Sequence, residues 1–488
     1  MDDFKHPHTE TAGHIDTSSV RECLKKGDAR LALQYCHELL ACNPKHIQTL
    51  LFAVLASRSL GWLEEALGFI NRASVIAPNH PVFQSLMGDI LLLKNRPKEA
   101  LSALLQAQEF GDSSAQTCFN IGSAYLALAA YEDAKIYFDK ALAIDPQMAV
   151  AHVNKGLAEH SLMNLDAALR CFDEALCIDP SNIDAKWNKS HVLLTIGRYE
   201  EGFKLYETRW QHSQVRLKKQ NFDSKFWLGK ENLSGKTILL FAEGGFGDTL
   251  QFIRYAKLFN GDVNLIIQCQ LPLIDLIKGM GIRAEIITLG EIPPAHDYHC
   301  PLMSLPLAFG TTVETVPQCD QYVFADPNQA QFWVDELQSL ARPKIGVMVR
   351  GSGSFKNDRR AIELAELAKF LPPSWSYVFL QKDLEENELR YIRARSNWRA
   401  PCPTFSGAAA ICHSLDHIIT VDTSIAHLSA AMGKPTTVLL AYRPDWRWGA
   451  EGETTEWYPS ARLIRQNHLG SWKDALSTWH MDCLQDFT

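Results

Sequence analysis

Alanine recurs at an interval of 34 residues through the first part of the chain. Five alanines keep this register: Ala32, Ala66, Ala100, Ala134 and Ala168. A second slot, seven residues later, is alanine in four of the five copies, and glycine fills a third slot in the middle copies. Because side chains this small let two helices cross closely, the period predicts a stack of helix pairs.

Proline ends most copies of the repeat. The third copy has Asp112 at this slot, and the other four have Pro44, Pro78, Pro146 and Pro180. Since proline cannot continue a helix, it marks the turn into the next pair. A 34-residue period with small residues at two slots and a terminal proline is typical of tetratricopeptide repeats. An ordinary helical domain with chance spacing does not explain five alanines in one register.

The sixth copy begins near Ile183 and departs from the pattern. Gly202 replaces its first alanine and Arg209 its second. Terminal repeats are expected to be atypical, because one face must cap the stack. We therefore predict a flexible tail over residues 1–12, followed over residues 13–212 by five tetratricopeptide repeats and a capping repeat.

Composition and charge exclude several classes of protein. A chain of 488 residues is too long for one core, and its net charge of −8 forms no basic stripe, which argues against nucleic acid as a partner. No apolar run approaches about 18 residues, so we expect no membrane span. The amino-terminal residues lack the features of a signal peptide, which predicts a cytoplasmic protein. The twelve cysteines include no CxxC pair, which predicts reduced thiols and no metal site. The oligomeric state stays open.

In the second half of the chain, short apolar runs alternate with helical patterns. A polar stretch over residues 213–232 predicts a linker. The alternation forms two series that divide near Pro343, and strands alternating with helices imply parallel sheets. We therefore predict an α-solenoid followed by two Rossmann-type α/β lobes, over residues 233–342 and 343–488. Ligands of such sheets bind at the carboxyl ends of strands, beside helix amino termini.

The first candidate loop, EGGFGD at residues 243–248, follows a predicted strand and precedes a helix. Glycines there let a ligand or another backbone approach closely. The loop does not match GxGxxG, and no P-loop lysine follows it, so the common nucleotide motifs fit badly. Asp248 has two interpretations: a general base aimed at a substrate hydroxyl, or the N-cap of a helix that begins at Thr249.

The second candidate loop, residues 350–360, follows the first strand of the second lobe. Its small residues, its hydroxyls such as Ser352 and its lysine Lys356 suit anion binding through backbone N–H groups and an ammonium group. The alternative is a solvated basic surface loop.

The third candidate loop ends a strand in Asp422, Thr423 and Ser424 at the start of a helix. Hydroxyl groups there can cap the helix and also face a phosphate. His427 lies three residues after Ser424 and shares its helix face. This histidine is either a ligand contact or an ordinary structural residue.

Aromatic and basic residues gather after the next predicted strand, over residues 442–448 and 457–459. Such a cluster can form a lip on which a sugar or a base stacks. It can equally be the packing of a carboxy-terminal segment that returns across the lobes.

Together, the EGGFGD loop, the Lys356 loop and the run VDTSIAH…GKP resemble the inverting GT-B glycosyltransferases, and the resemblance covers essentially the whole chain. The chain is most similar to bacterial tetratricopeptide proteins whose catalytic half resembles lipopolysaccharide heptosyltransferases. It is more distantly similar to the O-linked N-acetylglucosamine transferases, which share the repeat-plus-GT-B layout. Where those enzymes commonly have a tryptophan and a serine in the second loop, this chain has Val349, Arg350 and Ala361.

The resemblance implies a role for each matching residue. The proposed catalytic base falls on Asp248, and the lysine that contacts the donor diphosphate falls on Lys356, with Ser352 on an upstream hydroxyl. The segment that grips the donor sugar and pyrophosphate falls on Asp422, Thr423, Ser424 and His427. Further candidates are Glu243, Gly245 and Gly247 in the first loop and Arg443 in the aromatic and basic cluster. These enzymes use a nucleotide-sugar as substrate and need no metal or cofactor.

We therefore expect an inverting, metal-independent glycosyltransferase that acts on a hydroxyl of a protein held by the repeat concavity. Bacterial relatives of this layout are linked to flagellin or surface-protein glycosylation, which makes these the expected acceptor class. One alternative is a non-catalytic repeat scaffold with a degenerate transferase domain. Another is a transferase that acts on lipopolysaccharide or a small glycan. The donor nucleotide and sugar stay open.

Overall fold

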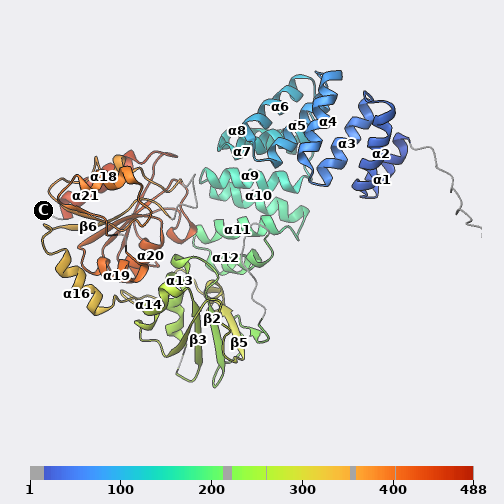
Figure 1. Ribbon diagram of the computed structural model, residues 1–488. Coiled ribbons are helices and arrows are strands. Elements are labelled where there is room, and N and C mark those ends of the chain that lie inside the picture. Colours follow the sequence, from blue (N-terminus) through green and yellow to red (C-terminus); the bar gives the residue numbers. More distant parts are fainter. Residues whose placement is uncertain (1–15, 213–221, 260, 352–358, 402, 487–488) are drawn as a thin grey trace, which may run out of the picture. The chain divides into compact units, whose positions relative to one another are not determined.

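The computed structural model describes residues 16–212, 222–259, 261–351, 359–401 and 403–486 (Figure 1), and for residues 483–486 it describes the backbone alone. The chain divides into two compact units, Met1–Asn182 and Ile183–Thr488. The described residues include ten cysteines, all of them unpaired and six of them buried.

The described part of the first unit is a row of antiparallel helix pairs. Each helix packs on its partner, and each of the first four pairs packs on the next pair along the chain. The alanines that keep the 34-residue register are fully buried, so the predicted repeat of helix pairs is confirmed. The helices are α1 (Thr17–Lys25), α2 (Ala29–Cys42), α3 (Ile47–Ser59), α4 (Leu63–Ile76), α5 (Pro81–Leu93), α6 (Pro97–Glu109), α7 (Ala115–Ala127), α8 (Tyr131–Ile144), α9 (Ala149–Ser161) and α10 (Leu165–Ile178).

Glycine is required where the two helices of a pair cross. A Cβ atom at Gly122 would lie 2.7 Å from Cε1 of Phe138, and one at Gly156 would lie 2.6 Å from Cε1 of Phe172. Both distances are far shorter than a van der Waals contact, so a larger residue would push the helices apart. The small-residue slots of the sequence therefore mark the helix crossings.

A second feature of the backbone follows the same period. The turn between the two helices of each pair contains one residue with positive φ, at Gly27, Gly61, Asn95, Ala129 and Met163. This left-handed conformation is easy for glycine and strained for residues with a side chain. Copies four and five therefore hold an alanine and a methionine in a strained conformation.

Asp112 replaces the terminal proline of the third copy with a different turn chemistry. Its carboxylate accepts hydrogen bonds from the backbone N–H of Ser114 at 3.1 Å and from the hydroxyl of Thr117 at 2.8 Å. Asp side chains commonly hold turns in this way by bonding to the backbone two residues on. The turn into α7 is therefore kept without proline.

The second unit begins with the capping pair. Its helices are α11 (Ile183–Thr195) and α12 (Tyr199–Tyr206), followed by the 3-10 turn η1 (Glu207–Trp210). They pack on the α/β part of the same unit: Trp446 makes edge contacts with the rings of Phe203 and Tyr206, and the indole N–H of Trp457 donates to the hydroxyl of Tyr199 at 3.1 Å. The sixth copy is thus integral to the second unit.

Two parallel sheets form the rest of the second unit (Figure 1). The first has the order β1-β5-β2-β3-β4 and the second the order β11-β10-β9-β6-β7-β8, with every neighbouring pair parallel. The predicted parallel sheets are confirmed. The strands are β1 (Lys225–Phe226), β2 (Thr237–Phe241), β3 (Asn264–Cys269), β4 (Ala284–Thr288), β5 (Tyr298–Pro301), β6 (Lys344–Met348), β7 (Ser376–Phe379), β8 (Trp398–Arg399), β9 (His417–Val421), β10 (Thr436–Leu440) and β11 (Ala461–Arg465).

Helices connect these strands, as parallel neighbours require. The central strands are buried: one core contains side chains of both sheets, and a second core lies on one face of the second sheet. The helices and 3-10 turns are α13 (Phe246–Phe252), η2 (Ile253–Leu258), η3 (Leu271–Leu273), α14 (Ile274–Lys278), η4 (Leu302–Ser304), α15 (Leu305–Ala308), α16 (Pro327–Glu336), α17 (Leu364–Leu367), α18 (Glu386–Arg393), α19 (Phe405–His413), α20 (Ser424–Ala431), η5 (Trp446–Trp448) and α21 (Lys473–Asp486).

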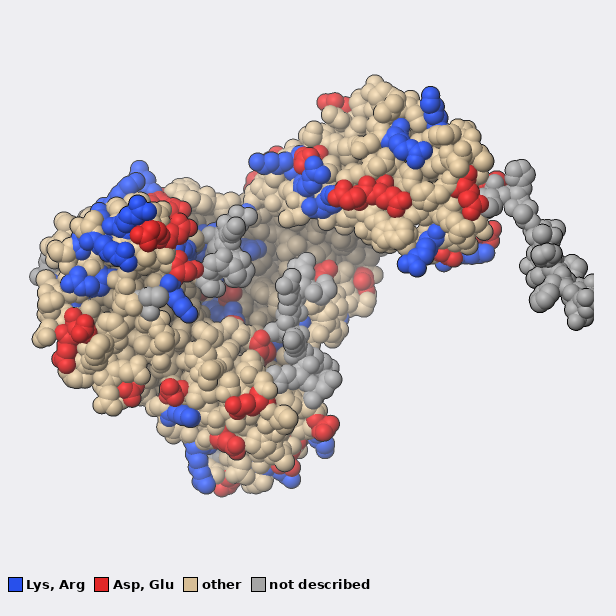
Figure 2. Space-filling model, in the orientation of Figure 1, with Lys and Arg blue, Asp and Glu red and all other residues tan. Residues whose placement is uncertain are grey.

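The aromatic cluster after β10 is packing. Trp446, Trp448, Trp457 and Tyr458 are at most 2% exposed. The sequence allowed either a stacking lip or the packing of a returning carboxy-terminal segment. The burial of these side chains favours packing. Acidic and basic side chains are interspersed over the face shown in Figure 2. Among the described residues, no helix combines the length and apolar character of a membrane span.

Candidate functional site

Each sheet contains a point at which its strand order reverses. β2 lies between β3 and β5, and β6 lies between β7 and β9. Numbered in its own chain order, the second sheet runs 3-2-1-4-5-6, the order of doubly wound dinucleotide-binding sheets. Ligands of such sheets bind outside the carboxyl ends of the two strands that flank the reversal. The loops that follow β2, β6 and β9 are the three candidate loops of the sequence.

The EGGFGD loop begins its helix earlier than the sequence predicts. Helix α13 starts at Phe246 instead of Thr249, with Gly245 as its N-cap in extended backbone. Asp248 is therefore not the N-cap that one interpretation of the sequence assigned to it. It is the third helical residue, and its Oδ2 accepts a hydrogen bond from the backbone N–H of Gly245 at 2.7 Å. A hydrogen bond from the N-cap N–H to the side chain of the third helical residue is one half of a capping box.

The glycines of this loop make room for groups of the protein itself. A Cβ atom at Gly244 would lie 2.2 Å from Oδ2 of Asp248, and one at Gly247 would lie 2.6 Å from Cδ2 of His427. At Gly245 the nearest atom would be at an ordinary 3.6 Å. Gly247 thus lets α13 pack on α20, which joins the carboxyl edges of the two sheets.

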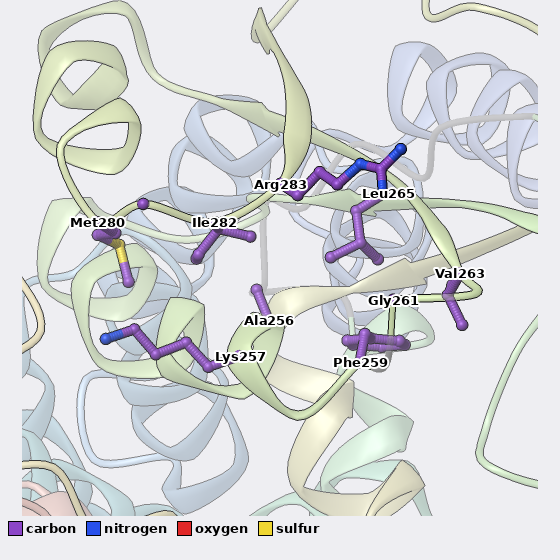
Figure 3. A pocket seen from close by; sticks show the side chains of 10 residues that line it. Ala256, Lys257, Phe259, Gly261, Val263, Leu265, Met280, Ile282 and Arg283 are labelled. Atoms are coloured by element: carbon purple, nitrogen blue, oxygen red, sulfur yellow. The ribbon is translucent and has the colours of Figure 1, made fainter.

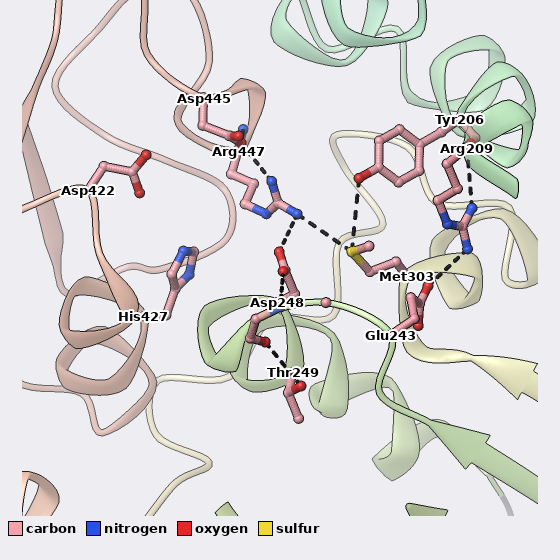
Figure 4. Close-up of polar contacts among 12 residues, drawn as sticks. Tyr206, Arg209, Glu243, Asp248, Thr249, Met303, Asp422, His427, Asp445 and Arg447 are labelled. Carbon is pink, nitrogen blue, oxygen red and sulfur yellow. Dashed lines mark hydrogen bonds and ion pairs between the residues drawn. The ribbon is translucent and has the colours of Figure 1, made fainter. Parts of the chain in front are cut away.

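An ion-pair network links the same two edges (Figure 4). Arg447, in the turn after β10, donates from Nη2 to Oδ1 of Asp248 at 2.5 Å and from Nη1 to Oδ1 of Asp445 at 2.8 Å. Burial alone would lower the pKa of Arg447, but the carboxylates of Asp445 and Asp248 raise it well above its usual value. Burial alone would raise the pKa of Asp445, and Arg447 lowers it. Arg447 and Asp445 are therefore charged at neutral pH.

His427 lies beside this network as a neutral ring. Its Nδ1 is hydrogen-bonded to the hydroxyl of Tyr458 at 2.9 Å, and its ring centroid lies 5.1 Å from that of Trp448. Burial, and then the nearby charge of Arg447, lower its pKa to about 3. A neutral imidazole can donate a hydrogen bond to a donor sugar or accept one from it, but it does not attract phosphate by charge.

Asp422 stands at the carboxyl end of β9, just before α20. It is 7% exposed, and burial together with the charge of Asp445 raises its pKa to about 6. Arg360 comes from the end of the second candidate loop, and its Nη1 donates to the backbone carbonyl of Asp422 at 3.2 Å. Thr423 is the N-cap of α20 and accepts from the N–H of Ile425 at 3.3 Å.

Ser424 is the first residue of α20 and is half-buried. Arg443 is exposed in the turn after β10. Ser352 and Lys356 lie outside the described residues. The structure thus brings Asp248, Asp422 and His427 together around Arg447, which Figure 4 shows side by side.

Glu243 belongs to a second buried network. Arg209, from the capping repeat, donates to Oε1 of Glu243 at 2.9 Å, to Oε1 of Glu207 at 2.6 Å and to the hydroxyl of Ser304 at 2.6 Å. Burial raises the pKa of Glu243 to about 7, although Arg209 acts to lower it. Among the described residues, its Oε2 has no hydrogen-bond partner. Glu243 therefore ties the capping repeat to the first candidate loop.

Sequence reasoning missed Arg447, Asp445, Arg209, Arg360 and Tyr458 as members of these networks. A signal existed for Arg209, because an arginine stands in a slot that is alanine in four of the five earlier copies. For Arg447, the only signal in the sequence was its place in the aromatic cluster. Within the described ranges, no three His, Cys, Asp or Glu side chains gather as metal ligands would.

A separate pocket of about 290 Å³ lies at the opposite end of the first sheet (Figure 3). Its lining includes Val263 and Arg283, which directly precede β3 and β4, together with Lys257 and Ile282. Since it adjoins the amino ends of these strands, it is not part of the carboxyl-edge site.

Comparisons with known proteins match the repeat half most clearly. A family profile of the tetratricopeptide repeat matches residues 115–148. The protein FlbA of Caulobacter vibrioides is 23% identical over 417 residues, which cover 78% of this chain and 69% of FlbA.

Among solved structures, the type IV pilus biogenesis factor PilW has a TM-score of 0.37 at 19% identity, covering 40% of this chain and 89% of PilW. YrrB, described as a tetratricopeptide protein with an unusual peptide-binding site, has a TM-score of 0.30 at 20% identity, covering 35% of this chain and 87% of YrrB. Likeness of this size carries no information about function.

Proposed function

We propose that this chain is an inverting, metal-independent glycosyltransferase of the GT-B type, which moves a sugar from a nucleotide-sugar to a hydroxyl of a protein acceptor. One observation supports this most: α13, which follows β2, packs on α20, which follows β9, so the reversal points of the two sheets lie against each other. Doubly wound sheets bind nucleotides at such points, and two facing edges offer separate places for donor and acceptor.

The proposed reaction is a direct displacement. Asp248 accepts the proton of the acceptor hydroxyl, whose oxygen then attacks the anomeric carbon of the donor sugar. The bond from that carbon to the diphosphate oxygen breaks on the opposite face, and the nucleoside diphosphate leaves with its electron pair. Lys356 and the amino terminus of α20, at Thr423 and Ser424, stabilise the charge of the leaving group.

The repeats supply the acceptor site in this proposal. The first helices of successive pairs, α1, α3, α5, α7 and α9, contact one another as well as their own partners, and more extensively than the second helices do. The first helices therefore line the inner side of the stack. Repeat solenoids bind extended partners along such a concave surface, so a segment of the acceptor protein is expected there.

One observation favours the alternative of a non-catalytic scaffold. Both carboxylate oxygens of Asp248 are engaged within the protein, by Arg447 and by the N–H of Gly245. Neither oxygen is therefore without a protein partner when an acceptor hydroxyl approaches. The scaffold alternative predicts that no nucleotide binds.

Direct binding of nucleotides tests the proposal. Purified full-length protein is titrated with UDP, GDP, ADP and CMP and with their sugars, beside the variants Lys356→Ala and Lys369→Ala. Lys369 is an exposed lysine of the same sheet region and serves as the matched control. The proposal predicts saturable binding of one nucleotide, at least about tenfold weaker in Lys356→Ala only. A folded protein that binds none of them contradicts it.

A further inference from the structure

We propose that Arg447 is the receptor for the donor diphosphate, and that Asp248 occupies it whenever no nucleotide is bound. Nucleotide binding then releases the Asp248 carboxylate for proton transfer. This inference rests on the proposed transferase function and adds to it a residue that sequence reasoning did not assign, together with a mechanism by which the donor activates the base.

Arg447 stands where a donor phosphate is expected. It lies in the turn after β10, the neighbour of β9 in the second sheet, and it is close enough to Asp422 and His427 for its charge to lower the pKa of both. Asp422 directly precedes the amino terminus of α20. The guanidinium therefore faces the carboxyl edge at which doubly wound sheets bind phosphates.

The partners of Arg447 differ in how firmly they hold it. Asp445 belongs to the same turn, and its Oδ1 accepts from both Nη1 and the backbone N–H of Arg447, at 2.8 and 3.1 Å. This contact holds Nη1 within the turn, and Nη2 also contacts Sδ of Met303 at 3.7 Å. Nη2 reaches Asp248 at 2.5 Å, while among the described residues Nε has no partner at all. The arginine thus has donors left over for an incoming oxyanion.

Asp248 is the exchangeable partner. About a quarter of its side chain is exposed, at 26%, against 10% for Arg447. If Arg447 turns to a phosphate, Asp248 keeps its capping hydrogen bond from Gly245. Carboxylate and phosphate bind the planar guanidinium fork in the same manner, so the two compete for the same donors.

The other buried arginines of this unit lack such a partner. Arg254 donates to the carbonyls of Gln251 and Trp457 and to the hydroxyl of Tyr322, all of them buried. Arg209 pairs with Glu243, whose side chain is 3% exposed, and with Glu207 of its own 3-10 turn, at 19%. Arg447 therefore stands out as a buried cation whose partner on the opposite sheet edge reaches solvent.

The test uses the sign of a change in affinity. Full-length wild type, Asp248→Asn and Arg447→Gln are titrated with inorganic pyrophosphate and with the nucleoside diphosphates of the panel by calorimetry. If Asp248 competes with the ligand, Asp248→Asn binds about tenfold more tightly, since one charge-assisted hydrogen bond no longer has to be broken. Arg447→Gln binds at least about tenfold more weakly.

The controls separate competition from general effects. Asp262→Asn removes the same charge at an exposed site of the first sheet and should leave the affinity unchanged. Melting curves establish that each variant is folded, and Asp248→Ser replaces Asp248→Asn if the latter unfolds. If the ion pair between Arg447 and Asp248 is only structural, Asp248→Asn should have a lower melting temperature and should bind nucleotide equally well or more weakly.

The outcomes distinguish this inference from the proposed function. Nucleotide binding by wild type that is unchanged or weakened in Asp248→Asn overturns the role of Arg447 and leaves the transferase proposal standing. Absence of binding by wild type and by every variant overturns both. Tighter binding in Asp248→Asn together with weaker binding in Arg447→Gln supports both.

Discussion

At the scale of single residues, buried charges hold the candidate site together. Arg447 and Arg209 each join two carboxylates, and His427 is kept neutral beside them. Breaking a buried pair leaves an uncompensated charge, which costs far more than the loss of a surface pair. The stability of the second unit should therefore depend strongly on these few side chains and on the pH.

His427 should make the second unit less stable in acid. Its folded pKa of about 3 lies below the usual value of about 6.5. Between these values the unfolded chain binds a proton that the folded protein does not, so stability falls as the pH falls. The expected loss from this residue is about 1.4 kcal/mol per pH unit below 6.

The measurement is urea unfolding at pH 7, 6 and 5, followed by tryptophan fluorescence. Eleven of the twelve tryptophans lie beyond residue 182, so the signal reports the second unit. Because Asp422 and Glu243 titrate with the opposite sign, the comparison is with His427→Gln, whose stability should depend less on pH. Equal pH dependence in the two proteins would show that His427 is not the responsible group.

Gly247→Ala should destabilise the contact between α13 and α20. The new Cβ would meet the imidazole of His427, which Tyr458 and Trp448 hold in place. Overpacking of this kind costs about 1–3 kcal/mol. Gly245→Ala is the matched control, because its Cβ meets no atom closer than 3.6 Å. Equal melting temperatures for the two variants would contradict this account of the EGGFGD glycines.

At the scale of elements, the repeat helices could be predicted well from sequence and the site helices less well. A helix crossing needs small residues at fixed spacing, and that requirement is written locally into each repeat. The start of α13 was missed by three residues, because Gly245 is an N-cap without a capping side chain. The pairing of Asp248 with Arg447 could not be predicted, since 199 residues separate them and only the fold brings them together.

The turn within each repeat offers a stabilising substitution. Ala129 adopts φ of 60°, at a slot that is glycine in the first two copies. Ala129→Gly should raise the stability of the first unit by about 1 kcal/mol, because glycine avoids the left-handed strain. Ala127→Gly, at the exposed end of α7, should lower it by up to about 1 kcal/mol. Thermal melting followed by circular dichroism measures both, and a lower melting temperature for Ala129→Gly would refute the argument.

At the scale of the whole molecule, the capping repeat belongs to the α/β unit. The sequence pattern assigns residues 183–212 to the repeats. In the structure, however, these residues belong to the second compact unit. The slot that breaks the pattern, Arg209, makes the contacts with Glu243 and Ser304 that explain this. Departure from a repeat consensus was thus the one sequence sign of this junction, and the partners themselves could not be identified without the fold.

Arg209→Ala should therefore destabilise the second unit severely. It leaves the buried carboxylate of Glu243 without its cation, which costs about 3–5 kcal/mol. Arg198→Ala removes an exposed arginine paired with Glu201 in the same repeat and should cost less than about 1 kcal/mol. Urea unfolding followed by tryptophan fluorescence compares them, and a small effect of Arg209→Ala would show that the junction does not depend on this pair.

The measurement that tests the central claim most directly is the slow transfer of the donor sugar to water, which needs no knowledge of the acceptor. Full-length protein is incubated with the nucleotide-sugar that binds, and proton NMR identifies the anomer released first. The account predicts inversion, with an α-linked donor releasing β-sugar, and a rate at least about 100-fold lower in Asp248→Asn. Release with retention, or no release from any nucleotide-sugar by the folded protein, would contradict it.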